Sequence, residues 1–281
     1  VGDIVSKEVP HKDFGRIAAQ TAKQTMMQQL KKAEKGRVYE DFKDSIGTII
    51  SGVIRRFEDG NAILDFQKAE GILPVNYKIP SDNFMVGERV NALLLEIDTI
   101  GTGPSLILTR RSRNFLRKLF EREVSEISDG IVTIKDVARE PGSRAKISVI
   151  SNDPRVDPIG ACIGIRGSRV KNITAELSGE RIDIIRYDEN IVKYITNAMQ
   201  PAIPKKVEVS DEGRFANVYV DKDQIKLAIG RNWQNAKLVS QLVGFERINV
   251  LASEEESSSF EKQLNDAIKN MASSLSITED T

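Results

Sequence analysis

The sequence has few of the residues on which catalysis, metal binding and cross-linking usually depend. Its 281 residues include one cysteine, Cys162, and one histidine, His11. A lone cysteine excludes an internal disulfide, fits a reducing compartment, and is more often a small buried residue than a nucleophile. With one histidine we find no histidine-centred triad and no multi-histidine metal site, and the carboxylates lack metal-ligand spacing. We therefore expect no enzymatic activity, no cofactor and no metal.

Long hydrophobic runs are also absent. No apolar stretch approaches the roughly 20 residues that a membrane span requires, and no signal peptide is visible. We therefore expect a cytoplasmic protein that has no membrane partner. The chain begins at Val1 instead of a methionine, and its opening is typical of the middle of a domain. We interpret it as a fragment, with a processed N-terminus as the alternative.

An excess of either charge is missing too, since 41 basic residues match 41 acidic ones. Acidic residues are concentrated in residues 252–281, where a Glu/Ser linker precedes an expected amphipathic helix, so the rest of the chain is mildly basic. A nucleic-acid partner would need local basic patches. The length and the 40% apolar content suffice for two or three modules.

The N-terminal part predicts a long helix and then a small barrel. Residues 13–35 carry apolar side chains at helical spacing before lysines and Gly36, which favours a helix packed on a neighbour over a free interaction helix. In residues 45–110 the period changes to two and predicts five short strands, as in an OB-fold barrel. A basic run follows, more typical of a solvated helix face than of a nucleic-acid track: Arg110, Arg111, Arg113, Arg117, Lys118 and Arg122.

The remainder contains an internal repeat. Residues 157–185 align with residues 223–251, and each copy reads as a short helix, a glycine turn, a longer helix and a strand. Two strand-like runs precede each copy, and a further helix fits between the copies. The repeating unit is therefore a helix, two strands, two helices and a strand.

The glycine turn of the first copy has the properties of a backbone-binding loop. Glycines at both ends, Gly164 and Gly167, allow positive φ and remove the Cβ atoms that would keep a sugar-phosphate chain away. The helix that follows directs free N–H groups at the turn, and Arg166, Arg169 and Lys171 add positive charge. A KH module grips single-stranded nucleic acid with such a GxxG loop.

The pattern closely resembles the bacterial NusA family of transcription elongation factors. The stretches that carry the resemblance are SNDPRVDPIGACIGIRGSRV, AREPGSRAKI, LAIGRNWQNAKL and DFGRIAAQTAKQ. The resemblance implies an α+β multidomain chain with a five-stranded OB-fold barrel and two tandem type II KH domains. The expected boundaries are 1–43 for the end of a truncated N-terminal domain, 44–110 for the S-one-type barrel, 111–187 and 188–251 for the KH domains, and 252–281 for the acidic tail.

The resemblance also implies partners. Members of this family bind RNA polymerase through the N-terminal domain, bind nascent single-stranded RNA through the barrel and KH units, and act in pausing, termination and antitermination with other factors. We expect the same of this chain, as a monomer. The alternatives are an RNA-binding appendage of an RNA-degradation complex, against which the order of the modules argues, and a purely structural assembly module.

By position, the resemblance assigns RNA-binding residues to both loops and to the barrel. The first loop contributes Gly164, Ile165, Arg166, Gly167, Ser168, Arg169 and Lys171, and the second contributes Gly230, Arg231, Asn232, Trp233, Gln234, Asn235 and Lys237. Bases would lie beside residues 182–185 and 248–251. On the barrel, the candidates for a stacking and charged surface are Arg55, Arg56, Phe57, Phe66 and Lys68, where either phenylalanine could instead belong to the core.

Trp233 departs from the family pattern, because it stands where the first loop has its second glycine. A tryptophan is strained at positive φ, and its bulk would hold a phosphate backbone away. Three interpretations remain open. The indole packs on a neighbouring surface and disables the loop, it stacks on a base, or it arose by mutation or sequencing error.

Overall fold

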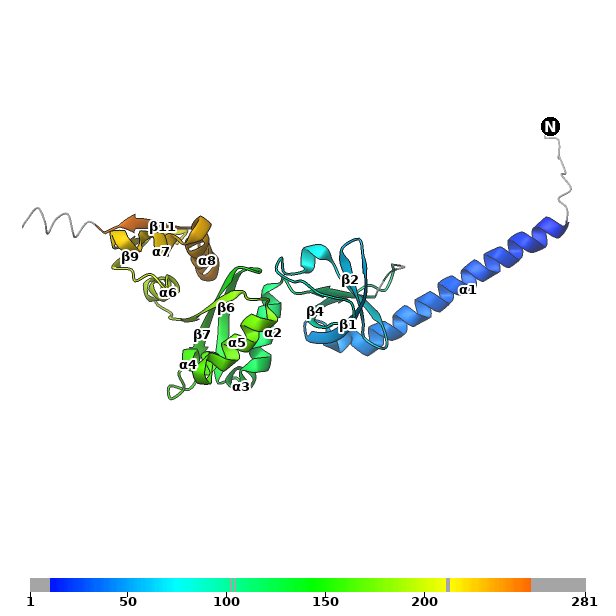
Figure 1. Cartoon of the computed structure of the whole chain (residues 1–281), viewed down its shortest axis with the longest axis horizontal. Helices are drawn as coiled ribbons and strands as arrows, with labels where there is room; N and C mark the ends of the chain where they lie inside the picture. The colour runs from blue at the N-terminus through cyan, green and yellow to red at the C-terminus, as the bar shows by residue number, and fades with distance from the viewer. Residues whose placement is uncertain (1–10, 102, 104, 211–212, 254–281) are drawn as a thin grey trace, which may run out of the picture. The chain divides into compact units, whose positions relative to one another are not determined.

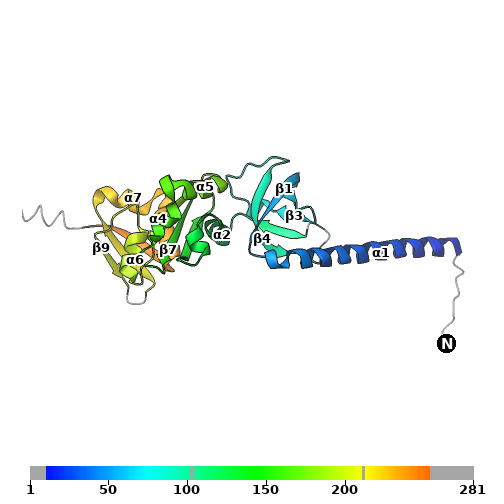
Figure 2. The same ribbon diagram turned by 90° about the horizontal axis from the view of Figure 1, so that it is seen from below.

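The computed structural model describes residues 11–101, 103, 105–210 and 213–253. The chain divides into two compact units, Val1–Leu119 and Phe120–Thr281, and each is described by itself. Figure 1 and Figure 2 show the elements of both units in two perpendicular views. The expected tail helix in residues 252–281 lies almost wholly outside the described residues. No helix among the described residues is both long and apolar enough to cross a membrane.

A single long helix, α1 (His11–Phe42), opens the first unit and runs uninterrupted in both views. The predicted end at Gly36 is wrong, because the helix continues for six more residues. Tertiary packing outweighs the low helix propensity of glycine: Val38 and Phe42 contact the core of the barrel, and the Lys35 ammonium lies 3.2 Å from the Asp98 carboxylate. A short 3-10 turn, η1 (Lys43–Ser45), then leads into the first strand.

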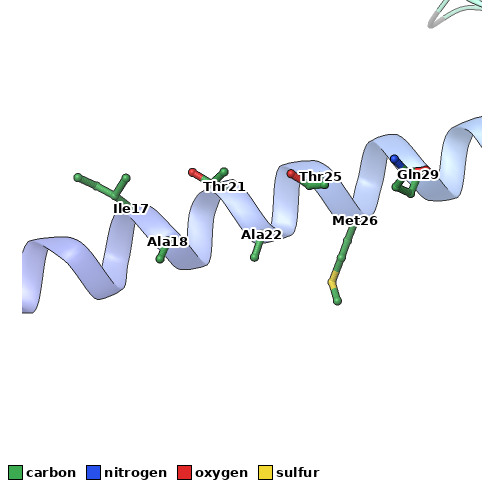
Figure 3. A pocket seen from close by; sticks show the side chains of 7 residues that line it. All are labelled: Ile17, Ala18, Thr21, Ala22, Thr25, Met26 and Gln29. Carbon is green, nitrogen blue, oxygen red and sulfur yellow. The ribbon is translucent and has the colours of Figure 1, made fainter.

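The apolar stripe of α1 is not covered by the described residues, contrary to the expectation that it packs on a neighbour. Met26 is 73% exposed, and Ile17 and Leu30 are more than half exposed. Figure 3 shows side chains of this surface, which all project from α1: Ile17, Ala18, Thr21, Ala22, Thr25, Met26 and Gln29. Helical periodicity identified the stripe but carried no information about what lies against it.

Five strands form the predicted closed barrel. They are β1 (Ile49–Glu58), β2 (Asn61–Asp65), β3 (Glu70–Leu73), β4 (Arg89–Ile97) and β5 (Leu106–Thr109), with the 3-10 turn η2 (Val75–Tyr77) between β3 and β4. The strand order is β1-β2-β3-β5-β4, antiparallel except for the β3–β5 pair. Alternating aliphatic side chains from all five strands fill the interior, which confirms the OB-like prediction.

Arg110 is part of the barrel and not of an exposed basic face. Its guanidinium is 2% exposed, and its Nε donates to the Asp82 carboxylate at 2.9 Å. The same guanidinium lies 5.1 Å from the ring centroid of Phe84 and 5.2 Å from that of Phe115. Burial with a charged partner therefore excludes Arg110 from a nucleic-acid track.

The first repeat has the predicted order of elements, with two helices where one was predicted before the first strand. Two helices, α2 (Arg113–Glu123) and α3 (Ser125–Ser128), precede the strands β6 (Val132–Glu140) and β7 (Arg144–Ser151). The helices α4 (Pro158–Ile163) and α5 (Ser168–Glu176) follow, and β8 (Arg181–Arg186) pairs in parallel with β7. A fully buried ion pair, Arg139 with Glu180, joins β6 to the residue before β8 at 2.8 Å.

The second repeat has the same order. Its elements are α6 (Ile191–Ala198), β9 (Lys206–Val209), β10 (Phe215–Val220), η4 (Lys222–Gln224), α7 (Ile225–Ile229), α8 (Gln234–Val243) and β11 (Arg247–Ala252). The sheet order is β9-β10-β11, with β11 parallel to β10 as β8 is to β7. The predicted unit of helix, two strands, two helices and strand is confirmed for both repeats.

The two repeats share one hydrophobic core. Ala138 on β6 and Ile185 on β8 belong to the same buried cluster as Tyr194 on α6 and Leu238 and Leu242 on α8. Side chains of the second repeat therefore cover apolar positions of the first repeat's sheet. Burial of this continuous surface favours one compact body over two separate modules.

Candidate nucleic-acid interface

The two glycine turns have nearly the same backbone conformation, although only one of them ends in glycine. Gly164 (φ 72, ψ 176) corresponds to Gly230 (φ 75, ψ 173), and Arg166 (φ 53, ψ 25) corresponds to Asn232 (φ 51, ψ 39). The 3-10 turns are η3 (Ile165–Gly167) and η5 (Arg231–Trp233). Each turn is followed directly by a helix of nine or ten residues whose first turn has no side-chain cap. The positive end of the helix dipole at such a start favours an anionic ligand.

Glycine is required at the first position of each loop for a steric reason. A Cβ built on Gly230 would lie 2.8 Å from the backbone nitrogen of Asn235, and one built on Gly164 would lie 2.8 Å from Cγ of Arg169. Positive φ adds strain for any residue with a Cβ. The first residue of each loop can therefore lie this close to the helix that follows the loop only if that residue has no side chain.

The last position of the loop is different, because it has room for a side chain. A Cβ built on Gly167 would meet nothing closer than 3.8 Å. Trp233 occupies the equivalent place with φ 62 and ψ 14, and its side chain is 61% exposed. Only backbone strain of about 1–2 kcal/mol opposes a side chain here. The exposed indole contradicts the interpretation in which it packs on a neighbouring surface.

Four cationic side chains surround the loops without an acidic partner in the part of the chain that the structure describes. Arg166 and Lys171 flank the first loop, and Arg231 and Lys237 flank the second, all of them exposed. Ser168, Asn232 and the 87% exposed Ile165 lie on the same loops. The sequence-predicted loop residues are thus brought together as two exposed, positively charged turns.

Three predicted loop residues face the protein instead. The Asn235 side chain is fully buried, and its amide donates to the carbonyls of Met199 and Ala228 at 3.1 and 3.0 Å. Arg169 donates to the Ala161 carbonyl at 2.6 Å and to Glu126 at 2.7 Å. Because the Asn235 amide nitrogen and the Arg169 guanidinium donate inside the fold, both residues support the loops from behind. The prediction that they contact RNA directly is not favoured.

The third inward-facing residue is Gln234. Its Nε2 donates to the Glu140 carboxylate and to the Ser143 hydroxyl, both at 2.6 Å. Both acceptors lie at the turn between β6 and β7 of the first repeat. The second loop is therefore hydrogen-bonded to the first repeat. No sequence pattern predicted this contact.

The strands proposed to flank the bases are edge strands, as expected. β8 and β11 each form one edge of a three-stranded sheet. Two exposed arginines at the ends of β8, Arg181 and Arg186, were not singled out from the sequence. The Arg186 guanidinium contacts Asp157 at 2.5 Å, so Arg181 is the better additional candidate. Its position as a basic residue at the start of the strand that was predicted to flank the bases could have identified it.

The candidate cations of the barrel are paired with acids. Arg55 contacts Asp65 at 2.5 Å, Arg56 contacts Glu70 at 2.7 Å, and Lys68 lies 3.3 Å from Asp41. Hydrogen bonds, first from Arg55 and then from the Gln67 N–H, hold the pKa of Asp65 below its usual range. The barrel surface thus offers less uncompensated charge than the two loops.

The two barrel phenylalanines differ in their surroundings. Phe66 packs on the barrel core, where a Cβ on Gly52 or Gly71 would lie 2.7 Å from its ring, and its edge contacts Phe42. Phe66 is therefore half-buried against the core, which leaves little of its ring for stacking. Phe57 is 40% exposed with the Lys78 ammonium 5.8 Å from its ring centroid, so it remains a candidate.

Cys162 is buried on α4, and burial raises the pKa of its thiol to about 12, which makes it a poor nucleophile. Within residues 11–253, apart from the few not described, no cluster of three or more potential ligands could hold a metal ion.

Comparison with known families matches three regions of the chain. The NusA-like first KH domain matches residues 110–187, the NusA-like second KH domain matches residues 191–258, and the NusA N-terminal domain matches residues 1–36. The two KH matches cover the two repeats that the structure shows to be alike.

Curated relatives agree with these matches. The chain is 43% identical over 245 residues to the transcription termination/antitermination protein NusA of Halalkalibacterium halodurans, which covers 87% of this chain and 64% of that protein. The corresponding proteins of Bacillus subtilis and Thermus thermophilus are 41% and 39% identical, over 87% and 88% of this chain and 66% and 64% of their own lengths. The chain thus spans less than two thirds of these relatives. With the barrel, the tandem repeats and both loops, these similarities show that the chain belongs to the NusA family.

Proposed function

We propose that this chain is a non-catalytic RNA-binding transcription elongation factor that takes part in pausing, termination and antitermination. The single observation that carries the proposal is the pair of exposed loops with matching backbone, each followed by an uncapped helix N-terminus and flanked by unpaired cations. Relatives named as transcription termination/antitermination proteins support the same proposal.

The loops would hold a single-stranded RNA mainly through its backbone. Gly164 and Gly230 have no side chain to keep a phosphate away, and the positive end of a helix dipole follows each loop. Arg166 and Lys171 would neutralise phosphates at the first loop, as Arg231 and Lys237 would at the second. Bases would lie beside the edge strands β8 and β11, at residues 182–185 and 248–251.

The further partners in this proposal are RNA polymerase and other termination or antitermination factors. The chain would bind them as a monomer in the cytoplasm. The polymerase would be bound mainly by the N-terminal domain, of which residues 1–43 are the final part. The proposed domains that follow are the barrel at residues 44–110, the two KH domains at residues 111–187 and 188–251, and the acidic tail at residues 252–281. Support comes from the family match to residues 1–36 and from the order of barrel and repeats.

A salt titration tests the RNA-binding part. The dissociation constant of a fluorescently labelled, unstructured single-stranded RNA is measured for the whole chain between low and moderate salt. We expect affinity to fall linearly in a log-log plot, because phosphate contacts release counterions. The Arg166→Ala, Lys171→Ala double variant should reduce the slope by about two, one for each lost contact.

A matched control makes the outcome specific. Lys193 is an exposed lysine on α6, away from both loops in sequence, and Lys193→Ala should leave the slope unchanged. A titration without any salt dependence, or an equal loss in the control, would contradict the proposed role of the loops.

A further inference from the structure

Trp233 is held in an unfavourable conformation and exposes a large aromatic surface. It is one of six non-glycine residues with positive φ among those described, and the only aromatic one of them. An indole that is 61% exposed gains little from burial to offset this strain. A strained, exposed aromatic side chain in a binding loop indicates a contact with a ligand outside the chain.

The loop that presents the indole is fixed on both sides. Immediately after Trp233, Gln234 is hydrogen-bonded to the turn of the first repeat, and Asn235 is hydrogen-bonded to Met199 and Ala228. On the other side, Gly230 lies against the backbone of Asn235. The backbone beneath the indole therefore has little freedom, and a ligand would find the ring on a preorganised support.

The neighbours of the indole favour a nucleotide. Arg231 and Asn232, in the same turn, are both exposed, so a cation and an amide stand next to an aromatic ring. The cation can bind a phosphate, and the amide can bind a sugar or phosphate oxygen. The aromatic ring can stack on the flat face of a base.

We propose that Trp233 stacks on a nucleobase of the bound single strand, so that the second loop binds a base face where the first loop binds backbone alone. This inference rests on the proposed RNA-binding function and adds to it a specific contact. Gly167, at the equivalent position of the first loop, has no side chain, so the indole makes the two similar loops different. Because every base has an aromatic face, the contact adds affinity without reading a sequence.

The experiment exploits the fact that Trp233 is the only tryptophan of the chain. The whole chain is titrated with an unstructured oligoadenylate RNA and, separately, with an abasic ribose-phosphate oligomer of equal length. Binding is followed by anisotropy of a label on the oligomer, and stacking by the intrinsic tryptophan emission. We expect the RNA to quench the emission and the abasic oligomer to bind without quenching it.

Variants at the same position complete the test. Trp233→Leu keeps a large apolar side chain at positive φ and should weaken RNA binding by on the order of tenfold, whereas Trp233→Phe should retain most of the affinity. Abasic-oligomer binding should be the same in all three proteins. Unchanged emission while the labelled RNA binds would overturn the proposal, as would tighter binding by Trp233→Gly, which would show that the indole blocks the loop. Failure of the labelled RNA to bind at all would instead refute the proposed function itself.

Discussion

Gln234 of the second loop donates a 2.6 Å hydrogen bond to Glu140 of the first repeat. This contact, with a second one to Ser143, joins residues that are more than ninety positions apart in the sequence. It crosses between repeats that the sequence suggests are independent copies. The position of one loop therefore depends on the other repeat.

Removal of this contact should loosen the second loop. Gln234→Ala should cost about 1 kcal/mol in the free energy of unfolding and accelerate amide hydrogen exchange at residues 230–234. RNA affinity should fall without a change in the salt slope, because no charge is lost. Gln234→Glu, which faces the Glu140 carboxylate, should be worse than alanine. Equal exchange rates in all three proteins would show that the contact does not hold the loop.

The two glycine positions of the loops should respond differently to alanine. Gly167→Ala meets only the strain of positive φ, so we expect a loss of about 1–2 kcal/mol in the free energy of unfolding. Gly230→Ala adds a 2.8 Å approach to the backbone nitrogen of Asn235, and overpacking of this kind costs about 1–3 kcal/mol more. Urea denaturation of both variants measures the difference. Similar losses would contradict the steric argument.

The buried ion pair of the barrel should matter far more than an exposed one. Asp82→Ala would leave the Arg110 guanidinium buried without its carboxylate, and we expect a loss of about 3–5 kcal/mol. Arg55→Ala, which removes an exposed partner of Asp65, should cost less than about 1 kcal/mol. Chemical denaturation followed by circular dichroism compares the two. A small loss for Asp82→Ala would show that Arg110 finds another partner or water.

Lys146 should make the stability of the repeats depend on pH. Its ammonium is buried on β7, where it donates to Asp183 at 2.9 Å and to the Gln200 carbonyl at 2.8 Å. Burial lowers the pKa of Lys146 to about 8, although Asp183 opposes the shift, and the usual value is 10.5. Between these values the unfolded chain binds a proton that the folded chain has lost, so folding becomes more favourable as the pH rises.

The Lys146→Met variant isolates this contribution. The difference in free energy of unfolding, native chain minus variant, should increase by about 1–3 kcal/mol from pH 8 to pH 10.5 and stay flat below pH 7. Urea denaturation at a series of pH values measures it. Lys193→Met, at an exposed position, provides the control and should show no such increase. A difference that decreases over the same range would reverse the sign of the inferred shift.

Patterns within short segments predicted most of the fold. Alternation in residues 45–110 was sufficient for the barrel, and the internal repeat was sufficient for both three-stranded sheets, because each pattern reports which face of an element is buried. Gly164 and Gly230 identified both loops, since only glycine fits where the chain comes so close to the helix that follows.

Errors arose wherever the answer depended on a partner far away in the sequence. The end of α1 at Phe42 is set by packing on the barrel, and the burial of Arg110 is set by Asp82 and Phe84. Asn235 was predicted to contact RNA from the loop, but its amide donates a hydrogen bond to the Met199 carbonyl. A polar residue near a loop has the same appearance in the sequence whether it faces inward or outward.

The helix α1 has a further consequence as a mechanical element. Its 32 residues span about 48 Å at 1.5 Å per residue, and Val38, Phe42 and Lys35 fix its rotation at the barrel end. The direction in which Ile17 and Met26 face is therefore dictated by side chains several turns away. One residue inserted between the stripe and the anchor would turn the stripe by about 100° while leaving every side chain chemically intact. The number of residues between the anchor and the stripe therefore determines the direction of the stripe as much as the identity of its side chains does.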